Sequence, residues 1–143
     1  RQAPENYREE GLKIKHSQLC AEIMEYTDET KSFVCCLSSM NLLHFDEWKD
    51  ENQRYDPVMI LTAFLDAVYT EFIDKAKDIP FMEKALRFAK EHRSIGIGAL
   101  GYHSYLQKNR IPFESIQARA INRQMFDQIE WKSIIALYRA SAV

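Results

Sequence analysis

The chain is poor in the residues that mark linkers and disulfide scaffolds. Its 143 residues include only four glycines, four prolines and three cysteines. So little glycine and proline excludes a collagen-like or low-complexity chain. An odd number of cysteines, with Cys35 and Cys36 adjacent, does not suit the disulfide framework of a small secreted domain. We therefore expect a reducing, cytoplasmic setting.

The chain also lacks a strong charge of either sign and a long apolar run. It carries 19 basic and 21 acidic residues, a net charge of -2, and the basic residues are spread without a continuous run. Nucleic acids and anionic membrane surfaces are therefore poor candidates for partners. Asp66, Glu71 and Asp74 interrupt the longest apolar stretch, and the first ten residues hold no apolar signal core. We expect no membrane span.

Asp56 and Pro57 predict the start of a long helix. Asp accepts hydrogen bonds from the free amides of a first helical turn, and Pro at the first helical position loses no needed donor. Pro80 disfavours helical geometry at Ile79, so this helix is expected over about 57–77. Its predicted apolar face consists of Val58, Leu61, Leu65, Val68 and Phe72, widened by Ile60 and Phe64.

The remaining pattern predicts a helix-rich α/β fold in one partial domain without an internal boundary. Helices are expected over about 81–92, 102–109 and 115–138, the last with Ile121, Met125 and Ile129 inward. Alternation from Leu12 to Glu22 favours an extended segment and 26–32 reads as a polar turn, so 12–32 is expected to be an extended segment that ends in a loop. The apolar run 33–37 predicts a strand, and 95–98 predicts another.

Gly96, Gly98 and Gly101 have the G-x-G-x-x-G spacing of a dinucleotide-binding turn. That motif needs a full strand immediately before it, whereas 88–93 reads as the end of a charged helix. Glycines in an apolar strand also allow close approach of a neighbouring backbone without any ligand. We therefore interpret them as structural.

Gln18, Cys20 and Glu22 are spaced to leave the same side of an extended segment. By themselves, three polar residues opposite three apolar ones are most often the solvated face of a strand. A zinc site is possible by count, from His16, Cys20, Cys35, Cys36 and His44, but the paired C-x-x-C spacing is missing. The residues alone leave these readings open.

Two segments around these cysteines resemble the large subunits of aerobic, class I ribonucleotide reductases. Residues 15–23 (KHSQLCAEI) look like the finger-loop motif S-N-L-C-x-E-I, and 33–42 (FVCCLSSMNL) resembles the segment that follows it in that family. The similarity continues through 64–68, 87–89, 93–103 and 111–115. It covers roughly residues 9 to 130 in family order, which is far more specific than a single motif.

The resemblance implies a partial segment of the family's ten-stranded α/β barrel and a part in converting ribonucleotides to 2′-deoxyribonucleotides for DNA replication. Cys20 would form a transient thiyl radical that removes the 3′ hydrogen, and Glu22 would accept the proton of the 3′ hydroxyl. Gln18 would hydrogen-bond the substrate. Cys35 would be one of two redox-active thiols that reduce the substrate and close a disulfide. Cys36 has no role in the family.

The resemblance also implies partners, with no cofactor or metal held by this chain. The substrate would be a ribonucleoside diphosphate, and the radical would come from a metal-containing small subunit. An external dithiol protein, thioredoxin or glutaredoxin, would reopen the disulfide. The rest of the large subunit, an allosteric enzyme that usually forms a dimer, would complete the site.

The chain departs from the family pattern in two respects. The family usually has Asn in place of Gln18, and the extra methylene displaces the amide by about 1.5 Å, which can cost on the order of a hundredfold in rate. The family's second redox cysteine, its phosphate-binding loop, its tyrosine pair and its C-terminal cysteines match nothing here, and residues 132–143 match the family poorly. We therefore expect these 143 residues to be inactive alone.

Two other functions remain open from the sequence. The first is an inactive remnant or a split-gene fragment that complements other pieces. The second is a helical interaction module that uses the apolar face of helix 57–77 and performs no catalysis.

Overall fold

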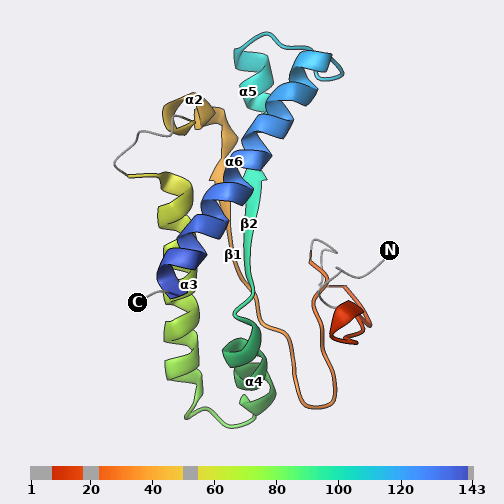
Figure 1. Ribbon diagram of the computed structural model, residues 1–143, viewed down its shortest axis with the longest axis vertical. Helices are drawn as coiled ribbons and strands as arrows, with labels where there is room; N and C mark the ends of the chain where they lie inside the picture. The colour runs from red at the N-terminus through yellow and green to blue at the C-terminus, as the bar shows by residue number, and fades with distance from the viewer. Residues whose placement is uncertain (1–7, 18–22, 50–54, 142–143) are drawn as a thin grey trace. The chain divides into compact units, whose positions relative to one another are not determined.

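The computed structural model describes residues 8–17, 23–49 and 55–141 (Figure 1). Contacts divide the chain into two compact units. The first, called the sheet unit, comprises Cys36–Val68 and Ile95–Val143, and the second, called the α4 unit, comprises Arg1–Cys35 and Tyr69–Ser94. The sequence shows no boundary at these points because the two units are built from interleaved segments.

Strands β1 (Cys36–Asn41) and β2 (Ile95–Leu100) form a parallel pair in the sheet unit. The register pairs Cys36 with Ile95 and Asn41 with Leu100, and the strands lie side by side in Figure 1. A tight turn cannot join parallel strands. The chain instead passes from one strand to the other through helices α3 (Pro57–Ala76) and α4 (Glu83–His92).

The two faces of this sheet differ in exposure, because side chains alternate between faces along each strand. Met40 is 8% exposed, and Ile97 on the same face packs against the core. On the other face, Leu37 and Leu100 are 52% and 51% exposed. Within the described ranges, one face is therefore covered and the other is open.

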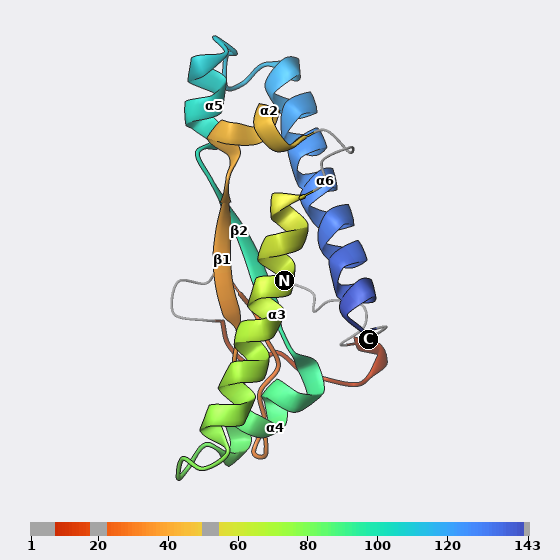
Figure 2. The same ribbon diagram turned by 90° about the vertical axis from the view of Figure 1, so that its left-hand side faces the viewer.

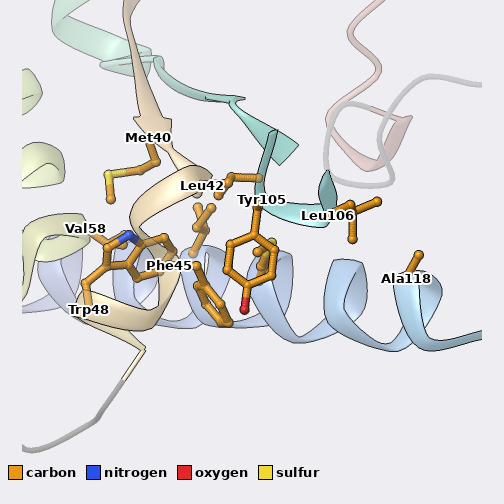
Figure 3. Packing of buried hydrophobic residues seen from close by; sticks show 10 residues of the cluster. Met40, Leu42, Phe45, Trp48, Val58, Tyr105, Leu106 and Ala118 are labelled. Carbon is orange, nitrogen blue, oxygen red and sulfur yellow. The ribbon is translucent and has the colours of Figure 1, made fainter. Parts of the chain in front are cut away.

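The core of the sheet unit is aromatic at its centre (Figure 3). The Phe45 ring lies edge-on to the ring of Trp48, with centroids 4.8 Å apart, and to that of Tyr105 at 6.1 Å. These residues come from α2 (Phe45–Trp48) and α5 (Tyr102–Lys108). The 3-10 helix η1 (Leu42–His44), α3 and α6 (Ile116–Ser141) contribute Leu42, Val58, Ala118, Met125 and Ile129 to the cluster, and α5 also contributes Leu106. The inward positions predicted for Met125 and Ile129 are confirmed.

The helices lie near their predicted positions. Those expected over 57–77, 102–109 and 115–138 are observed as Pro57–Ala76, Tyr102–Lys108 and Ile116–Ser141. Asp56 caps α3 as predicted, because its Oδ1 accepts from the amides of Val58 and Met59 at 2.9 and 3.2 Å. Helix α4 begins at Glu83 rather than at residue 81 because Phe81 has a left-handed φ of 68°.

The predicted apolar face of α3 is partly wrong. Ile60 and Phe64 are 53% and 61% exposed, so they do not widen a buried face. Thr62 is fully buried instead, because its hydroxyl is satisfied by donating to the carbonyl of Val58 at 2.8 Å. Because a polar residue was not expected inside, the predicted apolar face of α3 is displaced around the helix axis from the observed buried face. The buried residues are Val58, Thr62, Leu65, Tyr69 and Ala76.

The predicted strand over 33–37 is also misplaced. The observed strand begins at Cys36 and continues through Ser38 and Ser39 to Asn41, while 33–35 lie outside it. The apolar run predicted a buried strand, whereas residues 33–35 are half-buried and are held by the Phe33 ring and the Val34 carbonyl rather than by the sheet. The polar residues Ser38, Ser39 and Asn41 pair with β2, but their sequence has no pattern that is typical of a strand.

The structural reading of the glycine motif is confirmed. Gly96 and Gly98 lie within β2 rather than in a turn after it, and a Cβ on Gly98 would come 2.8 Å from Oγ of Ser39. Gly101 precedes α5 with a φ of 79°, and a Cβ there would come 2.5 Å from Oδ1 of Asn41. These glycines let β2 and its end lie close to β1.

A buried ion pair joins α6 to the start of α3. Nζ of Lys132 lies 2.7 Å from Oδ2 of Asp56, and the two side chains are 8% and 11% exposed. The same Nζ donates to the carbonyl of Trp48 at 3.1 Å and lies 5.7 Å from the centroid of its ring. One ammonium group therefore links three segments of the sheet unit.

We expect Gly101→Ala to lower the free energy of unfolding by about 2 kcal/mol or more, because a left-handed φ costs a non-glycine residue about 1–2 kcal/mol before any clash. Gly11→Ala is the matched control, since Gly11 has a φ of 70° but no atom within 4 Å of an added Cβ. Urea unfolding measures both losses. An equal loss in the two variants would show that the contact with Asn41 is unimportant.

We expect Lys132→Met to destabilise the chain by about 3–5 kcal/mol, because it leaves the Asp56 carboxylate buried without its cation. Adding Asp56→Asn to this variant should recover most of the loss, since Asn keeps an oxygen for capping α3 and carries no charge. Urea unfolding of both variants tests this. A double variant as unstable as the single one would refute the role of the ion pair.

Candidate active site

Three of the four predicted site residues, Gln18, Cys20 and Glu22, lie outside the described residues. The flanking residues 12–17 and 23–32 contain no strand, so the alternation that begins at Leu12 does not reflect pairing in a sheet over 12–17. The fourth, Cys35, is half-buried and immediately precedes β1. Of the predicted set, the structure therefore places only this thiol.

A tight turn centred on Asp28 precedes the segment that carries Cys35. Oδ1 of Asp28 accepts from the amides of Thr30 and Lys31 at 2.6 and 2.8 Å, and from the Thr30 hydroxyl at 2.9 Å. The Asp28 amide donates to the carbonyl of Lys31 at 3.0 Å, and Thr27 Oγ1 donates to the same carbonyl at 2.7 Å. This network closes the turn and reverses the chain.

Electrostatics reinforce this turn. The Tyr26 hydroxyl donates to the second carboxylate oxygen of Asp28. That hydrogen bond, followed by the one from the Thr30 amide, holds the pKa of Asp28 well below its usual range. The same contact raises the pKa of Tyr26, since it stabilises the protonated phenol. Asp28 is therefore ionised and Tyr26 neutral at neutral pH.

The residues that end the turn, Lys31 and Ser32, are bound to helix α4. Lys31 forms an ion pair with Glu91, and its Nζ lies 5.9 Å from the centroid of the Tyr26 ring. The amide of Ser32 donates to the carbonyl of Lys84 at 3.2 Å. The turn is therefore tied to both ends of α4.

The segment 33–35 is anchored by aromatic residues of the α4 unit. The Phe33 ring lies edge-on to that of Phe88, with centroids 6.3 Å apart. The hydroxyl of Tyr69, a fully buried residue of α3, donates to the carbonyl of Val34. The predicted face of α3 omitted Tyr69. Its spacing from Val58, Thr62 and Leu65 was the signal that could have identified it.

Two hollows of the described surface lie elsewhere. One of about 510 Å³ is lined by Tyr102, Phe113, Glu114, Arg119 and Asn122. Another of about 350 Å³ lies beside the Lys132 and Asp56 pair. Neither contains a predicted site residue. Across 8–17, 23–49 and 55–141, no three His, Cys, Asp or Glu side chains are arranged to hold a metal ion, and no helix is long and apolar enough to cross a membrane.

Comparisons with known proteins relate about nine-tenths of the chain or more to a single family. Residues 3–141 match the family model described as ribonucleotide reductase, barrel domain, so the poor family match expected from residue 132 onward is wrong for 132–141. The chain is 43% identical over 129 residues to the ribonucleoside-diphosphate reductase large subunit of Invertebrate iridescent virus 3, covering 90% of this chain and 20% of that protein. It is 42% identical over 130 residues to the putative large subunit of Frog virus 3 (isolate Goorha), covering 90% and 22%.

The fold agrees with the sequence. The structure is similar, with a TM-score of 0.86 and 49% identity, to the Actinobacillus ureae class Id ribonucleotide reductase alpha subunit, covering 93% of this chain and 25% of that one. The chain thus spans about a fifth to a quarter of the length of these relatives. Its helix-rich architecture with a small parallel sheet is a segment of an α/β barrel. The chain belongs to the barrel-domain family of ribonucleotide reductases.

Proposed function

We propose that this chain is part of the catalytic large subunit of a ribonucleoside-diphosphate reductase, which converts ribonucleoside diphosphates to 2′-deoxyribonucleotides for DNA synthesis. The observation that carries the proposal is the match to the family over residues 3–141, supported by 49% identity to a class Id alpha subunit of the same fold. The relatives that bear the name of this enzyme are similar over about nine-tenths of the chain.

The four residues of the family motif would divide the chemistry. The Cys20 thiyl radical would take the 3′ hydrogen, while Glu22 takes the proton of the 3′ hydroxyl. Gln18 would hydrogen-bond the substrate near its 2′ hydroxyl. As that hydroxyl leaves as water, Cys35 and a second thiol of the complete subunit would each lose one hydrogen and join in a disulfide. One hydrogen goes into the water and the other to C2′. Cys20 then returns the 3′ hydrogen, and Glu22 returns its proton to the 3′ oxygen, which restores the 3′ hydroxyl.

The exposure of the sheet fits a site inside the barrel. In α/β barrels the helices cover the outside of the sheet. The covered face with Met40 and Ile97 is therefore the outer one, and the open face with Leu37 and Leu100 is directed to the interior. A closed interior would keep the radical from side reactions.

The proposed reaction needs partners that supply the radical and the electrons. A metal-containing small subunit would generate the radical, and thioredoxin or glutaredoxin would reduce the disulfide at the expense of its own dithiol. Such dithiol exchange favours the reducing cytoplasm. The remainder of the large subunit, an allosteric dimer in this family, would complete the substrate pocket.

We expect Cys20→Ser in the complete enzyme to abolish turnover while leaving binding of the ribonucleoside diphosphate largely intact, because a hydroxyl does not carry the radical but fills the same space. Turnover assays with the small subunit and equilibrium binding measure the two effects. Cys36→Ser is the matched control and should retain turnover, since the family gives Cys36 no role. Full activity of Cys20→Ser would remove this thiol from the mechanism.

We also expect the 143-residue chain alone to reduce no ribonucleoside diphosphate, even with a radical-bearing small subunit and a dithiol, because the second thiol for Cys35 has no match among its three cysteines. Product formation is followed by chromatography of radiolabelled nucleotide. Restored turnover on adding the missing parts of the subunit would identify a complementing fragment. Product from the isolated chain would contradict the proposed division of the site.

A further inference from the structure

The peptide that joins Val34 to Cys35 precedes strand β1, and its carbonyl accepts a partly buried hydrogen bond. Strand β1 begins only at Cys36, and the carbonyl of Val34 accepts from the hydroxyl of Tyr69, which comes 35 residues later in the chain. Tyr69 is fully buried. A phenylalanine would fill this position equally well, so the hydroxyl serves the hydrogen bond.

Tyr69 is itself held in place. The guanidinium carbon of Arg93 lies 5.7 Å from the centroid of its ring, within range of a cation–π interaction. Nη2 of Arg93 also donates to Oγ1 of Thr70 at 2.8 Å. Arg93 ends α4 with a left-handed φ of 44°, and its amide donates to the carbonyl of Ala89 at 3.2 Å. In Figure 2 the lower part of α3 and α4 lie side by side.

We propose that Tyr69 is a positioning residue for the redox thiol Cys35. The carbonyl of Val34 and the amide of Cys35 belong to one planar peptide unit. Holding that carbonyl restrains the plane, and with it the position of the Cys35 Cα atom from which the side chain extends. Thiol–disulfide exchange depends on access to the sulfur and on its nucleophilicity. Restraint of the backbone at Cys35 therefore affects the rate at which this thiol reacts. The inference rests on the proposed function for the redox role of Cys35.

The Phe33 and Phe88 contact serves a complementary purpose. It anchors the same segment through the side chain of Phe33, two residues before Cys35, rather than through the Val34–Cys35 peptide plane. The hydroxyl of Tyr69 acts directly on that plane. Removing the hydroxyl should therefore alter the thiol without detaching the segment.

The test measures the reactivity of Cys35 in a Cys20→Ser/Cys36→Ser background, where it is the only one of the three cysteines left. We expect Tyr69→Phe to raise its second-order rate of alkylation by iodoacetamide about fivefold, the change in population of an opened segment that the loss of one hydrogen bond produces. The rate is measured across pH, at a temperature where each variant is folded.

Tyr102→Phe is the matched control. The hydroxyl of Tyr102 also donates to a backbone carbonyl, that of Ala118 at 2.6 Å, but in the sheet unit. If Tyr69 were merely structural, the two variants would lower stability similarly and leave the Cys35 rate alike. An alkylation rate in Tyr69→Phe equal to that in Tyr102→Phe would overturn the proposal.

A second variant covers the case in which Tyr69→Phe does not fold. Thr70→Val removes the exposed hydroxyl that receives Arg93, so it loosens the guanidinium over Tyr69 without touching the core. We expect a smaller rise in the same rate, about twofold. An unchanged rate in this variant would then overturn the proposal.

Failure of this inference is distinguishable from failure of the proposed function. Alkylation needs no turnover, so it reports on the thiol alone. Retained turnover of Cys35→Ser in the complete enzyme would remove the redox role while leaving the effect of Tyr69 on the thiol in place. An unaffected Cys35 rate in Tyr69→Phe would remove the positioning role and leave the chemistry of Cys35 untouched.

Discussion

The parallel pairing of β1 with β2 is the constraint on which the rest of the structure depends. It forces a long connection, because parallel strands cannot be joined by a hairpin, and that connection supplies α3 and α4. It also requires the glycines of β2, since a side chain at Gly98 would collide with Ser39. The first paired residue, Cys36, follows Cys35 directly, so the ladder fixes the chain on one side of the candidate redox thiol.

The sequence predicts the helices well and the first strand poorly, for a physical reason. Helix signals are local: Asp56 caps α3, Pro80 follows its end, and apolar spacing selects Met125 and Ile129. An apolar run such as 33–37 indicates that its residues are buried, but it does not indicate whether they pair in a sheet. Residues 33–35 become anchored through side chains of α3 and α4, whereas Ser38 and Ser39 pair with a strand far along the chain. Such long-range pairing leaves no local pattern in the sequence. The apolar face of α3 was predicted incorrectly because Thr62 is buried, with its hydroxyl donating to the carbonyl of Val58 within the helix.

The candidate site is known mostly through family resemblance rather than through physics. Spacing alone gave Gln18, Cys20 and Glu22 no more than the pattern of a solvated strand, and their assignment rests on the motif around them. Physical reasoning contributes where the structure describes the surroundings. It shows the Asp28 turn and the Tyr69 hydrogen bond, which bring together residues separated by up to 35 positions and which no motif encodes.

The position of Cys35 just outside the ladder suits a thiol that alternates between two states. A disulfide demands Cα atoms roughly 4.4–6.8 Å apart, so its formation requires its cysteines to approach and its reduction lets them separate. A cysteine within the paired strand could move only by breaking hydrogen bonds of the sheet. The segment before Cys36 also carries two restraints that do not belong to the sheet, the Tyr69 hydroxyl on the Val34 carbonyl and the aromatic contact at Phe33. The end of the strand thus joins a paired segment from Cys36 onward to a preceding segment that is restrained by side chains of α3 and α4.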